Sequence, residues 1–349
     1  LQNVFGADID QEGVKVPRGP DRDARDDGQF GMALRYMSEA LDTEFGGYYM
    51  NYHSRLPFFS ATAASQQVYN RATAVLTGSA AALQPIAVAA NSQYFIEYPE
   101  DIHLYGLSFS TTLPTGTAWA GEISYRPNAP VQMNTQDILF AAVGPLGGPV
   151  LPNASLLDVA PGQDLHGYRR KEITQFQSTL THFFDQVMGA DRLTLVGEVG
   201  VVHVGGLESS SDARYGRDPL PASAGGTINT CRQLNLGTVG ANGKNLTRFC
   251  EDDGYLTSTS WGYRARAIWD YNNVFAGINL KPNIAWSHDV EGYGPNGQFT
   301  EGAKAVSLGL DALYSNTYSA SLSYTNFFGG DYNTSVDRDF AALSFGMNF

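Results

Sequence analysis

Two arginines, Arg264 and Arg266, stand two positions apart in the stretch SWGYRARAIWDY. In an extended segment, residues two apart lie on the same face, so both guanidinium groups point the same way. A guanidinium binds a carboxylate through paired hydrogen bonds, and charged side chains of this kind also line narrow points in channels. We therefore expect this pair to line a constriction or to recognise a carboxylate, the alternative being inward ion pairs that brace the surrounding wall.

Other charged residues occupy the same face of alternating segments. A charge on the lipid face of a membrane strand costs about 2 to 4 kcal/mol near the midplane. If these segments are membrane strands, the charged side chains should therefore point towards the lumen. For each residue, an ion pair that fills the lumen remains the simpler role. The residues predicted to face the lumen are Arg35, Glu39, Arg55, Glu122, Arg126, Lys171, Glu198, Arg264, Arg266, Asp270, Lys281, Asp289 and Asp311.

Motifs for enzymatic chemistry are missing from the sequence. None of the six histidines forms HExxH or another metal-ligand spacing, and neither GxSxG nor a phosphate-binding glycine motif occurs. The acidic run DRDARDDG and the trio 251–253 could hold calcium, although such runs are usually only solvated. We therefore predict no enzyme, no cofactor and no metal. For His53, near the end of its segment, a hydrogen-bonding role is favoured over catalysis.

The cysteines, Cys231 and Cys250, flank the Gly/Asn-rich segment RQLNLGTVGANGKNLTRF. A pair of this kind in a loop indicates a disulfide and an oxidising compartment. Free thiols or half of a metal site are the alternatives, and no histidine lies nearby to complete the latter.

The elements that must position these residues are strands. Eleven segments alternate Tyr, Trp, Phe, Leu and Val on one face with small, polar or charged residues on the other, and most approach the roughly 9 to 11 residues that a tilted strand needs to cross a bilayer. The predicted strands are 29–40, 44–55, 102–113, 117–127, 169–184, 192–204, 259–271, 275–289, 303–314, 317–326 and 339–349.

Connectors between the segments alternate between short and long. Bacterial outer-membrane barrels have tight periplasmic turns and long external loops, so we predict that every long connector is external. Two of these loops, ATAVLTGSAAALQPIAVAA and DILFAAVGPLGGPVL, are apolar enough to need cover, and we expect some helix in them. They would form either an apolar site at the mouth or a packed plug. The longest predicted external loops are 56–101, 128–168 and 205–258.

Aromatic residues fall at the ends of the predicted strands, where a barrel meets the lipid headgroups. The segment count puts two tryptophans at the outer rim and two at the periplasmic rim, where the final strand also ends on an aromatic residue. The predicted girdle residues are Trp119, Trp261, Trp269, Trp286 and Phe349.

Composition agrees with a barrel and excludes other classes. The chain has 349 residues, 43% hydrophobic and only 16% charged. Its net charge of -13 argues against nucleic-acid binding, which needs a basic face. No run of about 18 apolar residues predicts a membrane helix. The predicted fold is all-β, a transmembrane antiparallel β-barrel over residues 1–349.

The odd number of strands does not suit a complete single-chain bacterial barrel, which has an even number. We therefore expect these to be the C-terminal eleven strands, with N-terminal strands missing and residues 1–28 as the tail of an external loop. A weak strand overlooked within a long connector is the alternative.

Two stretches carry a resemblance to a known family. YRRKEITQFQSTLTHFFDQVMGADRLTLVGEVGVVHVGGLES and IEYPEDIHLYGLSFSTTLPTGTAWAGEISYRPNAPVQ resemble signature regions of a large family of uncharacterised proteobacterial outer-membrane proteins. The resemblance implies a barrel fold and an outer-membrane location but no substrate. In plan alone, the design is similar to barrels that admit fatty acids and hydrocarbons.

From these observations we predict a channel in the bacterial outer membrane for passive uptake of hydrophobic or amphipathic small molecules, gated by apolar external loops. Its partners would be outer-membrane lipid, lipopolysaccharide and a small hydrophobic solute. One alternative is a docking component of an envelope-spanning assembly with a plugged barrel and periplasmic or envelope partner proteins. A barrel lipid hydrolase is the less favoured alternative, because a few residues brought together in space suffice for hydrolysis.

Overall fold

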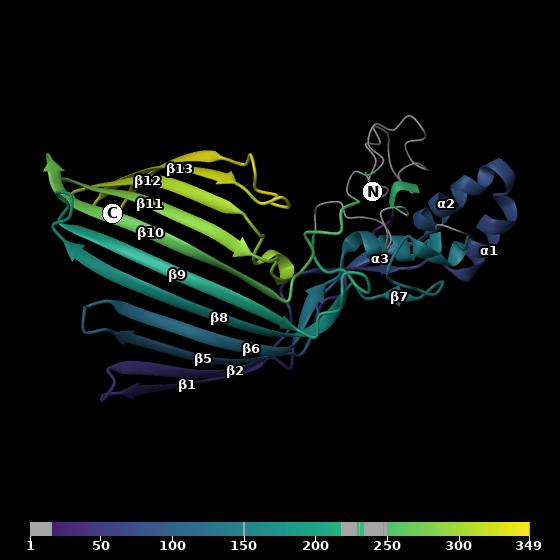
Figure 1. Cartoon of the computed structure of the whole chain (residues 1–349), viewed down its shortest axis with the longest axis horizontal. Helices are drawn as coiled ribbons and strands as arrows, with labels where there is room; N and C mark the ends of the chain where they lie inside the picture. Colours follow the sequence, from purple (N-terminus) through teal and green to yellow (C-terminus); the bar gives the residue numbers. More distant parts are fainter. Residues whose placement is uncertain are drawn as a thin grey trace.

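A single antiparallel sheet of eleven strands makes up most of the structure (Figure 1). The computed structural model describes residues 16–148, 151–217, 229, 231–233, 247 and 250–348. The strand order is β1-β2-β5-β6-β8-β9-β10-β11-β12-β13-β14, so each strand of this sheet pairs with the sheet strands before and after it in the chain. The eleven strands predicted from period-two alternation, and their antiparallel pairing, are confirmed.

The strand boundaries differ from the predicted ones by a few residues at some ends. The largest differences lie where strands run on towards the long connectors or past the short turns. The strands are β1 (Phe30–Ser38), β2 (Thr43–Tyr52), β5 (Ile102–Thr112), β6 (Ala118–Gln132), β8 (Tyr168–Asp185), β9 (Arg192–Gly205), β10 (Thr259–Phe275), β11 (Ile278–Glu291), β12 (Lys304–Tyr314), β13 (Tyr318–Phe328) and β14 (Phe340–Met347).

Short and long connectors lie at opposite ends of this sheet (Figure 1). The short turns use left-handed backbone, as at Asp42 (φ 46°), Asn273 (φ 50°) and Asn316 (φ 57°). Asn and Asp tolerate this conformation better than most residues, so the sequence favours reversal at these points. At the other end, the described parts of the connectors after β2, β6 and β9 pack together into what we call the loop module.

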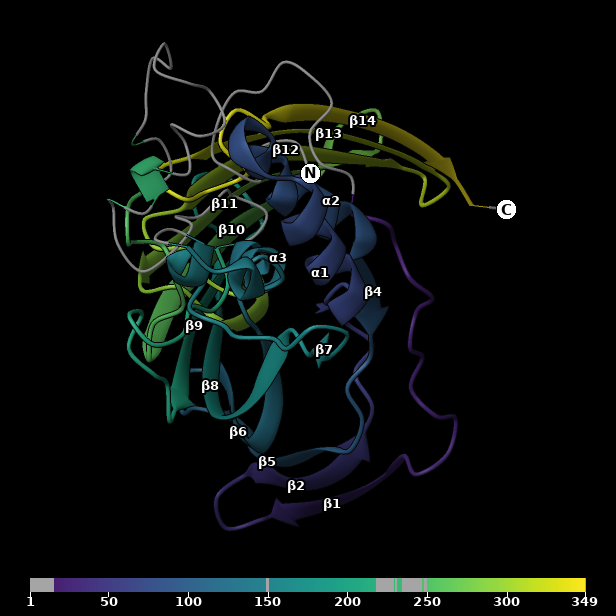
Figure 2. The ribbon, with the colours of Figure 1, turned by 90° about the vertical axis from the view of Figure 1, so that its right-hand side faces the viewer.

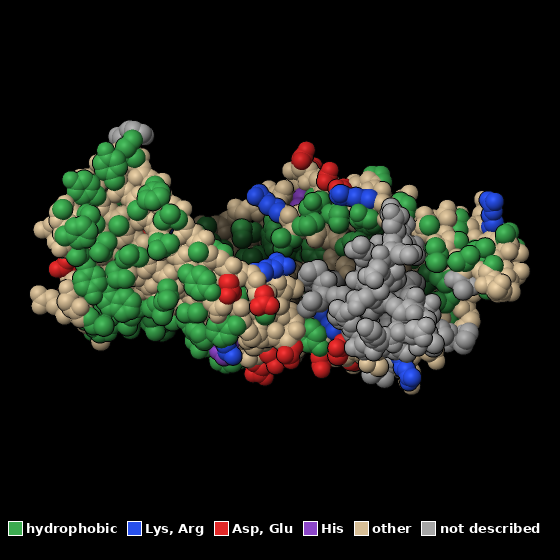
Figure 3. All heavy atoms as spheres, turned by 90° about the horizontal axis from the view of Figure 1, so that it is seen from above, with side chains coloured by type: hydrophobic (Ala, Val, Ile, Leu, Met, Phe, Trp, Pro, Cys, Tyr) green, Lys and Arg blue, Asp and Glu red, His purple; other side chains and the backbone are tan. Residues whose placement is uncertain are grey.

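The register gives the sheet two chemically different faces. On the outer face, Leu107 lies opposite Ile123, Ile123 opposite Phe176, and Leu308 opposite Tyr324. Leu107 is 65% exposed and Leu308 is 55% exposed. Figure 3 shows hydrophobic side chains spread over the sheet half of the molecule. The outer face is therefore an apolar surface that the described residues leave uncovered.

The inner face carries the polar side chains. Glu198 lies opposite Arg264 across β9 and β10, and Lys281 lies opposite Asp311 across β11 and β12. Figure 2 shows the sheet curving from β1 round to β14, which lie at the two ends of the curve. β1 and β14 are also the two ends of the strand order in the described chain.

The loop module combines a small sheet with short helices that lie beyond one end of the wall (Figures 1 and 2). The small sheet has the order β4-β3-β7 and lies in connectors that the sequence predicted as loops. Its strands are β3 (Phe58–Thr62), β4 (Gln93–Glu97) and β7 (Asp164–Leu165); the helices are α1 (Gln66–Val75), α2 (Gln84–Asn91) and α3 (Thr135–Ala141), with 3-10 turns η1 (Gly78–Leu83), η2 (Gly144–Leu146), η3 (Leu151–Asn153) and η4 (Pro295–Gly297).

The apolar loop stretches supply the core of this module. One hydrophobic cluster includes Tyr69, Val88 and Phe140, and a second includes Ile138 and Tyr215. All five side chains are 3% exposed or less. Of the two roles predicted for the apolar loops, the structure supports packing over an open apolar surface.

A proline limits how far helix α2 extends towards its N-terminus. Pro85 occupies the first turn of α2, a position where a missing N–H costs nothing, and it separates α2 from the preceding α1 and η1. Across the part of the chain that the structure describes, no helix has both the length and the apolar character needed to span a membrane.

Candidate functional site

Ion pairs and hydrogen bonds on the inner face satisfy several predicted lumen residues. Arg264 Nη2 lies 2.6 Å from Asp289 Oδ1, and Lys281 Nζ lies 2.8 Å from Asp270 Oδ1. Asp311 accepts a hydrogen bond of 2.6 Å from Ser321. For these residues the structure supports the bracing role considered beside recognition.

Glu198, Arg264 and Arg266 are brought together around a shallow cavity of about 290 Å³ in the inner face. Glu198 accepts hydrogen bonds from Gln177 (2.9 Å) and Thr179 (3.1 Å) on the neighbouring strand β8. Arg266 donates a long hydrogen bond of 3.4 Å to Asn283. The two arginines do share a face and a cavity, but only Arg264 has a carboxylate within ion-pair distance in the described residues.

Three further predicted lumen residues lie on strands β1 and β6, whereas Glu39, also predicted to face the lumen, lies in the turn after β1. Arg35 lies on edge strand β1, with its guanidinium 4.0 Å from Glu44. Glu122 lies on the inner face opposite Ser108 and Gln177. Arg126 lies on the same face of β6, where it donates a hydrogen bond of 3.3 Å to Gln175.

The prediction that Arg55 belongs to a wall strand is wrong. Strand β2 ends at Tyr52, because the chain turns into the loop module after His53. His53 fixes that turn through both ring nitrogens: the amide of Asp101 donates to Nδ1 (3.0 Å), and Nε2 lies 2.8 Å from the carbonyl of Asp27. Arg55 therefore extends from a connector at the loop-module end of the inner face, which we call the mouth.

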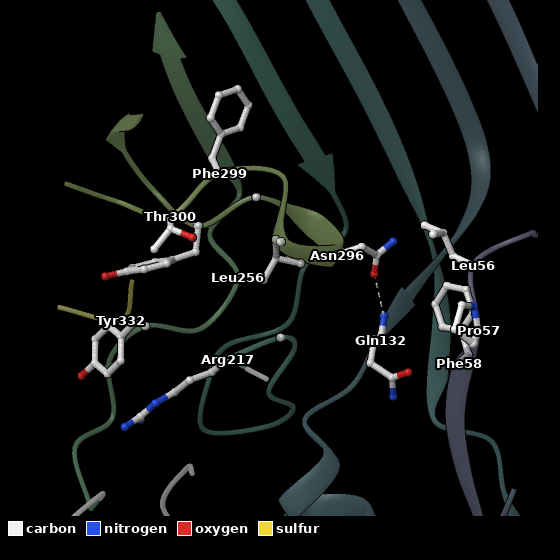
Figure 4. Close-up of a pocket in the computed structure, with 15 residues that line it drawn as sticks. Leu56, Pro57, Phe58, Gln132, Arg217, Leu256, Asn296, Phe299, Thr300 and Tyr332 are labelled. Carbon is white, nitrogen blue, oxygen red and sulfur yellow. Dashed lines mark hydrogen bonds between the residues drawn. The ribbon is translucent and has the colours of Figure 1, made fainter. Parts of the chain in front are cut away.

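A segment between β11 and β12 crosses this mouth. Asn296, in η4, bonds both to the backbone amide of Gln132 and to the carbonyl of Pro130 on β6, each at 3.4 Å. Figure 4 shows the Asn296 and Gln132 contact as a dashed line. These contacts tie a connector late in the chain to strand residues 164 and 166 positions earlier. We call residues 293–300 the crossing segment.

Glycines on the inner face make room for the crossing segment. The ring of Phe299 lies against Gly200 of β9 and Gly262 of β10, so a Cβ built on Gly262 would be 3.1 Å from that ring and 2.6 Å from the carbonyl of His288. Glycine at these positions therefore lets an aromatic side chain approach the wall closely. The crossing segment fills part of the space at this end of the inner face.

Cavities remain on both sides of the crossing segment. The loop-side cavity has about 300 Å³ and the wall-side cavity about 500 Å³. Both are lined by Leu56, Phe58 and Asn296. These three residues therefore separate the two cavities, and Leu56 is 59% exposed. Pockets of such size are within the range that holds small organic ligands.

The loop-side cavity has aromatic and cationic walls. Figure 4 shows Arg217 and Tyr332 on one side, with Leu56, Pro57 and Phe58 on the other. The Arg217 guanidinium lies 4.5 Å from the centre of the Tyr332 ring and donates a 2.7 Å hydrogen bond to the Glu251 carbonyl. Burial raises the pKa of Tyr293 to about 12, so the hydroxyl of this residue stays protonated well above neutral pH.

The wall-side cavity combines apolar walls with unpaired cations. Apolar contacts come from Leu56, Phe58, Ile102, Ile173 and Pro295, and polar groups from three glutamines and two arginines. The polar residues include Gln29, Arg55, Arg126, Gln175 and Gln298. No Asp or Glu is part of its lining in the described chain.

Buried polar contacts anchor the loop module above these cavities. Asp137 and Arg214 form a two-pronged contact, with Nε to Oδ2 at 2.8 Å and Nη2 to Oδ1 at 2.5 Å, and both side chains are 1% exposed. Burial opposes the charge on Arg214, but its hydrogen bonds with Asp137 outweigh burial and raise its pKa. The chain segment leading into Arg217 is therefore held in place.

A second polar cluster joins the module to the wall. Lys171 on β8 donates to Glu208 at 2.6 Å, and the Tyr215 hydroxyl donates to the same oxygen at 2.8 Å. Burial favours the neutral form of Glu208, but these hydrogen bonds outweigh it and lower the pKa of Glu208 to about 2. Lys171, predicted to face the lumen, instead points into this junction and is 9% exposed.

Cys231 and Cys250 form the predicted disulfide, with a Cα to Cα distance of 5.7 Å. Both are buried, at 3% and 4% exposure.

The predicted girdle tryptophans all lie on the outer face. Trp119 opposes Leu180, Trp261 opposes Val201, Trp269 opposes Leu193 and Trp286 opposes Val306. Trp261 and Trp286 lie towards the loop module, whereas Trp119 lies beside a short turn. Trp269 does not close its strand, because β10 continues to Phe275. Phe349 lies outside the described residues.

Sequence reasoning missed the residues that build the mouth. Gln132, Arg217 and the pair formed by Asn296 and Phe299 come from three separate parts of the chain, and no short-range pattern joins these parts. The one available signal was the run of glycines in EGYGPNGQF, which indicates a tight path without showing where it leads.

The fold and the mouth define a class: a curved antiparallel wall with an apolar outer face, a polar inner face and a folded module at one end. The chain belongs to the family described as Protein of unknown function (DUF1302), whose model matches residues 2–349. This confirms that the quoted stretches resemble a family without a known function. A comparison with curated proteins gives no match.

Proposed function

We propose that this protein is an outer-membrane channel for passive uptake of hydrophobic or amphipathic small molecules. In this proposal the sheet is part of a closed barrel, its outer face contacts lipid, and the loop module lies on the external side. The observation that carries the proposal is the pair of cavities that meet at Leu56, Phe58 and Asn296 between the loop module and the inner face.

The apolar side chains of the outer face support the proposal that this face contacts lipid. Large apolar side chains such as Leu107 (65% exposed), Leu322 (54%) and Leu343 (64%) are uncovered on one face of a continuous sheet. In water, each such side chain forgoes roughly 1.5 to 3 kcal/mol of burial free energy. A contiguous apolar face of this extent indicates contact with another apolar phase.

The cavities at the mouth support the proposal of a gated route for a solute. A molecule entering the loop-side cavity meets aromatic walls, then the separating residues, and then the wall-side cavity that opens towards the inner face. Gln175 and Arg126 line both the wall-side cavity and a further inner-face cavity of about 360 Å³. Movement of Leu56 or of the crossing segment would join these spaces.

Reconstitution tests this function. The purified chain, folded in nonionic detergent, should show the heat-dependent gel mobility of a barrel, and proteoliposomes should admit a fluorescent amphiphile faster than protein-free vesicles. A sheet that does not insert into vesicles contradicts the membrane proposal. Insertion without solute entry contradicts the channel proposal alone.

A plugged docking component of an envelope assembly is the second candidate. The crossing segment, tied to β6 at Gln132 and Pro130, favours it because the segment fills part of the mouth. Vesicles that pass neither ions nor solutes would favour docking.

The lipid hydrolase receives less support. Both nitrogens of His53 are engaged by backbone groups, so this histidine holds a turn and lacks a free nitrogen to accept a proton. Phospholipid hydrolysis that His53→Ala abolishes in a correctly folded chain would reverse this ranking.

A further inference from the structure

The wall-side cavity concentrates positive charge in a protein whose net charge is -13. Its described lining contains Arg55 and Arg126 but no carboxylate. Arginine stays charged at any physiological pH, so this space carries a positive potential. A cavity with unmatched charge inside an acidic protein indicates selection for a ligand of opposite sign.

Arg126 has unused hydrogen-bonding capacity in this cavity. Its Nη2 donates to Gln175 at 3.3 Å, while its buried Nε has no partner. Leaving a buried donor of a charged group unpaired costs free energy, and an anionic oxygen would satisfy it. Arg55 has no described carboxylate within ion-pair distance and is exposed to the cavity from the opposite element, the connector after β2.

The nearest acidic residue on the same strand face is Glu122, four positions before Arg126 on β6. At about 3.3 Å per strand residue, this separation corresponds to roughly 13 Å between their Cα atoms. Glu122 shares the next cavity along the inner face with Arg126, but it is absent from the wall-side lining. Arg126 is therefore free to pair with a group in the wall-side cavity.

We propose that the wall-side cavity binds the anionic headgroup of an amphipathic solute through Arg55 and Arg126. The amides of Gln175 and Gln298 surround the same headgroup position, and Leu56, Phe58, Ile102 and Ile173 contact the first part of the apolar tail. This inference rests on the proposed function and names the substrate class: amphiphiles with one negative charge, of which an alkyl carboxylate is the simplest.

Equilibrium binding tests the inference separately from transport. Isothermal titration calorimetry on the folded chain in nonionic detergent compares decanoate, decanol and decyltrimethylammonium, which share a tail length. Decanoate should bind at least about 10-fold more tightly than the other two, as expected for charge-assisted hydrogen bonds to two arginines. Arg55→Gln with Arg126→Gln should remove that preference while leaving decanol binding unchanged.

Arg35→Gln is the matched control, because Arg35 is a guanidinium on the same face but outside the cavity. It should leave decanoate binding unchanged. If the double variant proves unstable, Arg126→Lys replaces it in the test. This substitution keeps the charge and should retain part of the preference for decanoate. Equal binding of all three probes, or a preference that survives loss of both arginines in a folded chain, overturns the inference. Anion-selective binding without flux would contradict only the channel proposal.

Discussion

At the scale of single residues, the buried polar groups of the loop module matter because protein partners take the place of water around them. Asp137 and Arg214 are the clearest case, as both side chains are 1% exposed. Taking two charges out of water is costly, and good geometry compensates for that cost only while both partners are present. Asp137 also lies on α3, whose first turn is capped by Asn134.

Removing Arg214 should therefore open the loop module. Arg214→Met is expected to destabilise it by about 3 to 5 kcal/mol, because Asp137 is left buried without its cation. Native-state proteolysis in detergent measures the free energy of that opening. Arg18→Met serves as a control, since the Arg18 and Asp21 pair is exposed, and it should change little. Equal protease sensitivity of both variants would contradict the argument.

Glu208 makes module stability depend on pH. Its folded pKa of about 2 lies below the ordinary 4.5, so the folded state favours the charged form. The stabilisation is complete above pH 4.5 and is lost as the pH falls towards 2. The thermal midpoint should therefore drop over that range, and Glu208→Gln should flatten the drop. A variant with the same acid profile as the parent chain would remove Glu208 as the cause.

At the scale of elements, the wall strands were predictable and the mouth was not. Alternation between two faces is a local signal, so the eleven strands could be found one at a time. The signal failed where β6 continues past a register shift between Arg126 and Ala129, because a bulge breaks the alternation. The small strands β3 and β4 have only five residues each, too few for alternation to mark them.

The site residues divide in the same way. Alternation placed Glu198, Arg264 and Arg266 correctly on one face, since face depends only on the position along a strand. It could not find Asn296 or Phe299, because their positions follow from contacts between distant segments. Alternation also could not show which charged side chains form ion pairs, because pairing depends on the side-chain rotamers of residues on facing strands.

The crossing segment is the element most directly open to test. Phe299→Ala removes the ring that lies against Gly200 and Gly262, so the mouth should widen. Single-channel recordings in planar bilayers should show higher conductance than the parent chain. Phe327→Ala, on the inner side of β13 opposite Ala305, is the control and should conduct like the parent chain. If both variants conduct equally, the crossing segment does not limit passage.

At the scale of the whole molecule, the two faces of the sheet make opposite demands on a charge. Leu322 and Ser323 are neighbours on β13: Leu322 pairs with Leu310 on the outer face, while Ser323 pairs with Gly309 on the inner face. Leu322 is 54% exposed in the described chain. If water covered that surface, an arginine there would cost little; if lipid covers it, the charge must be desolvated.

Leu322→Arg should therefore destabilise the chain in phospholipid vesicles by about 2 to 4 kcal/mol, whereas Ser323→Arg should be tolerated because its charge points into the polar interior. Urea-dependent folding into vesicles, followed by heat-dependent gel mobility, measures the difference between these adjacent substitutions. The sign of that difference identifies the solvent of the outer face, because in water Leu322→Arg would improve solubility without loss of stability. A smaller effect for Leu322→Arg than for Ser323→Arg would mean that the apolar face meets something other than acyl chains.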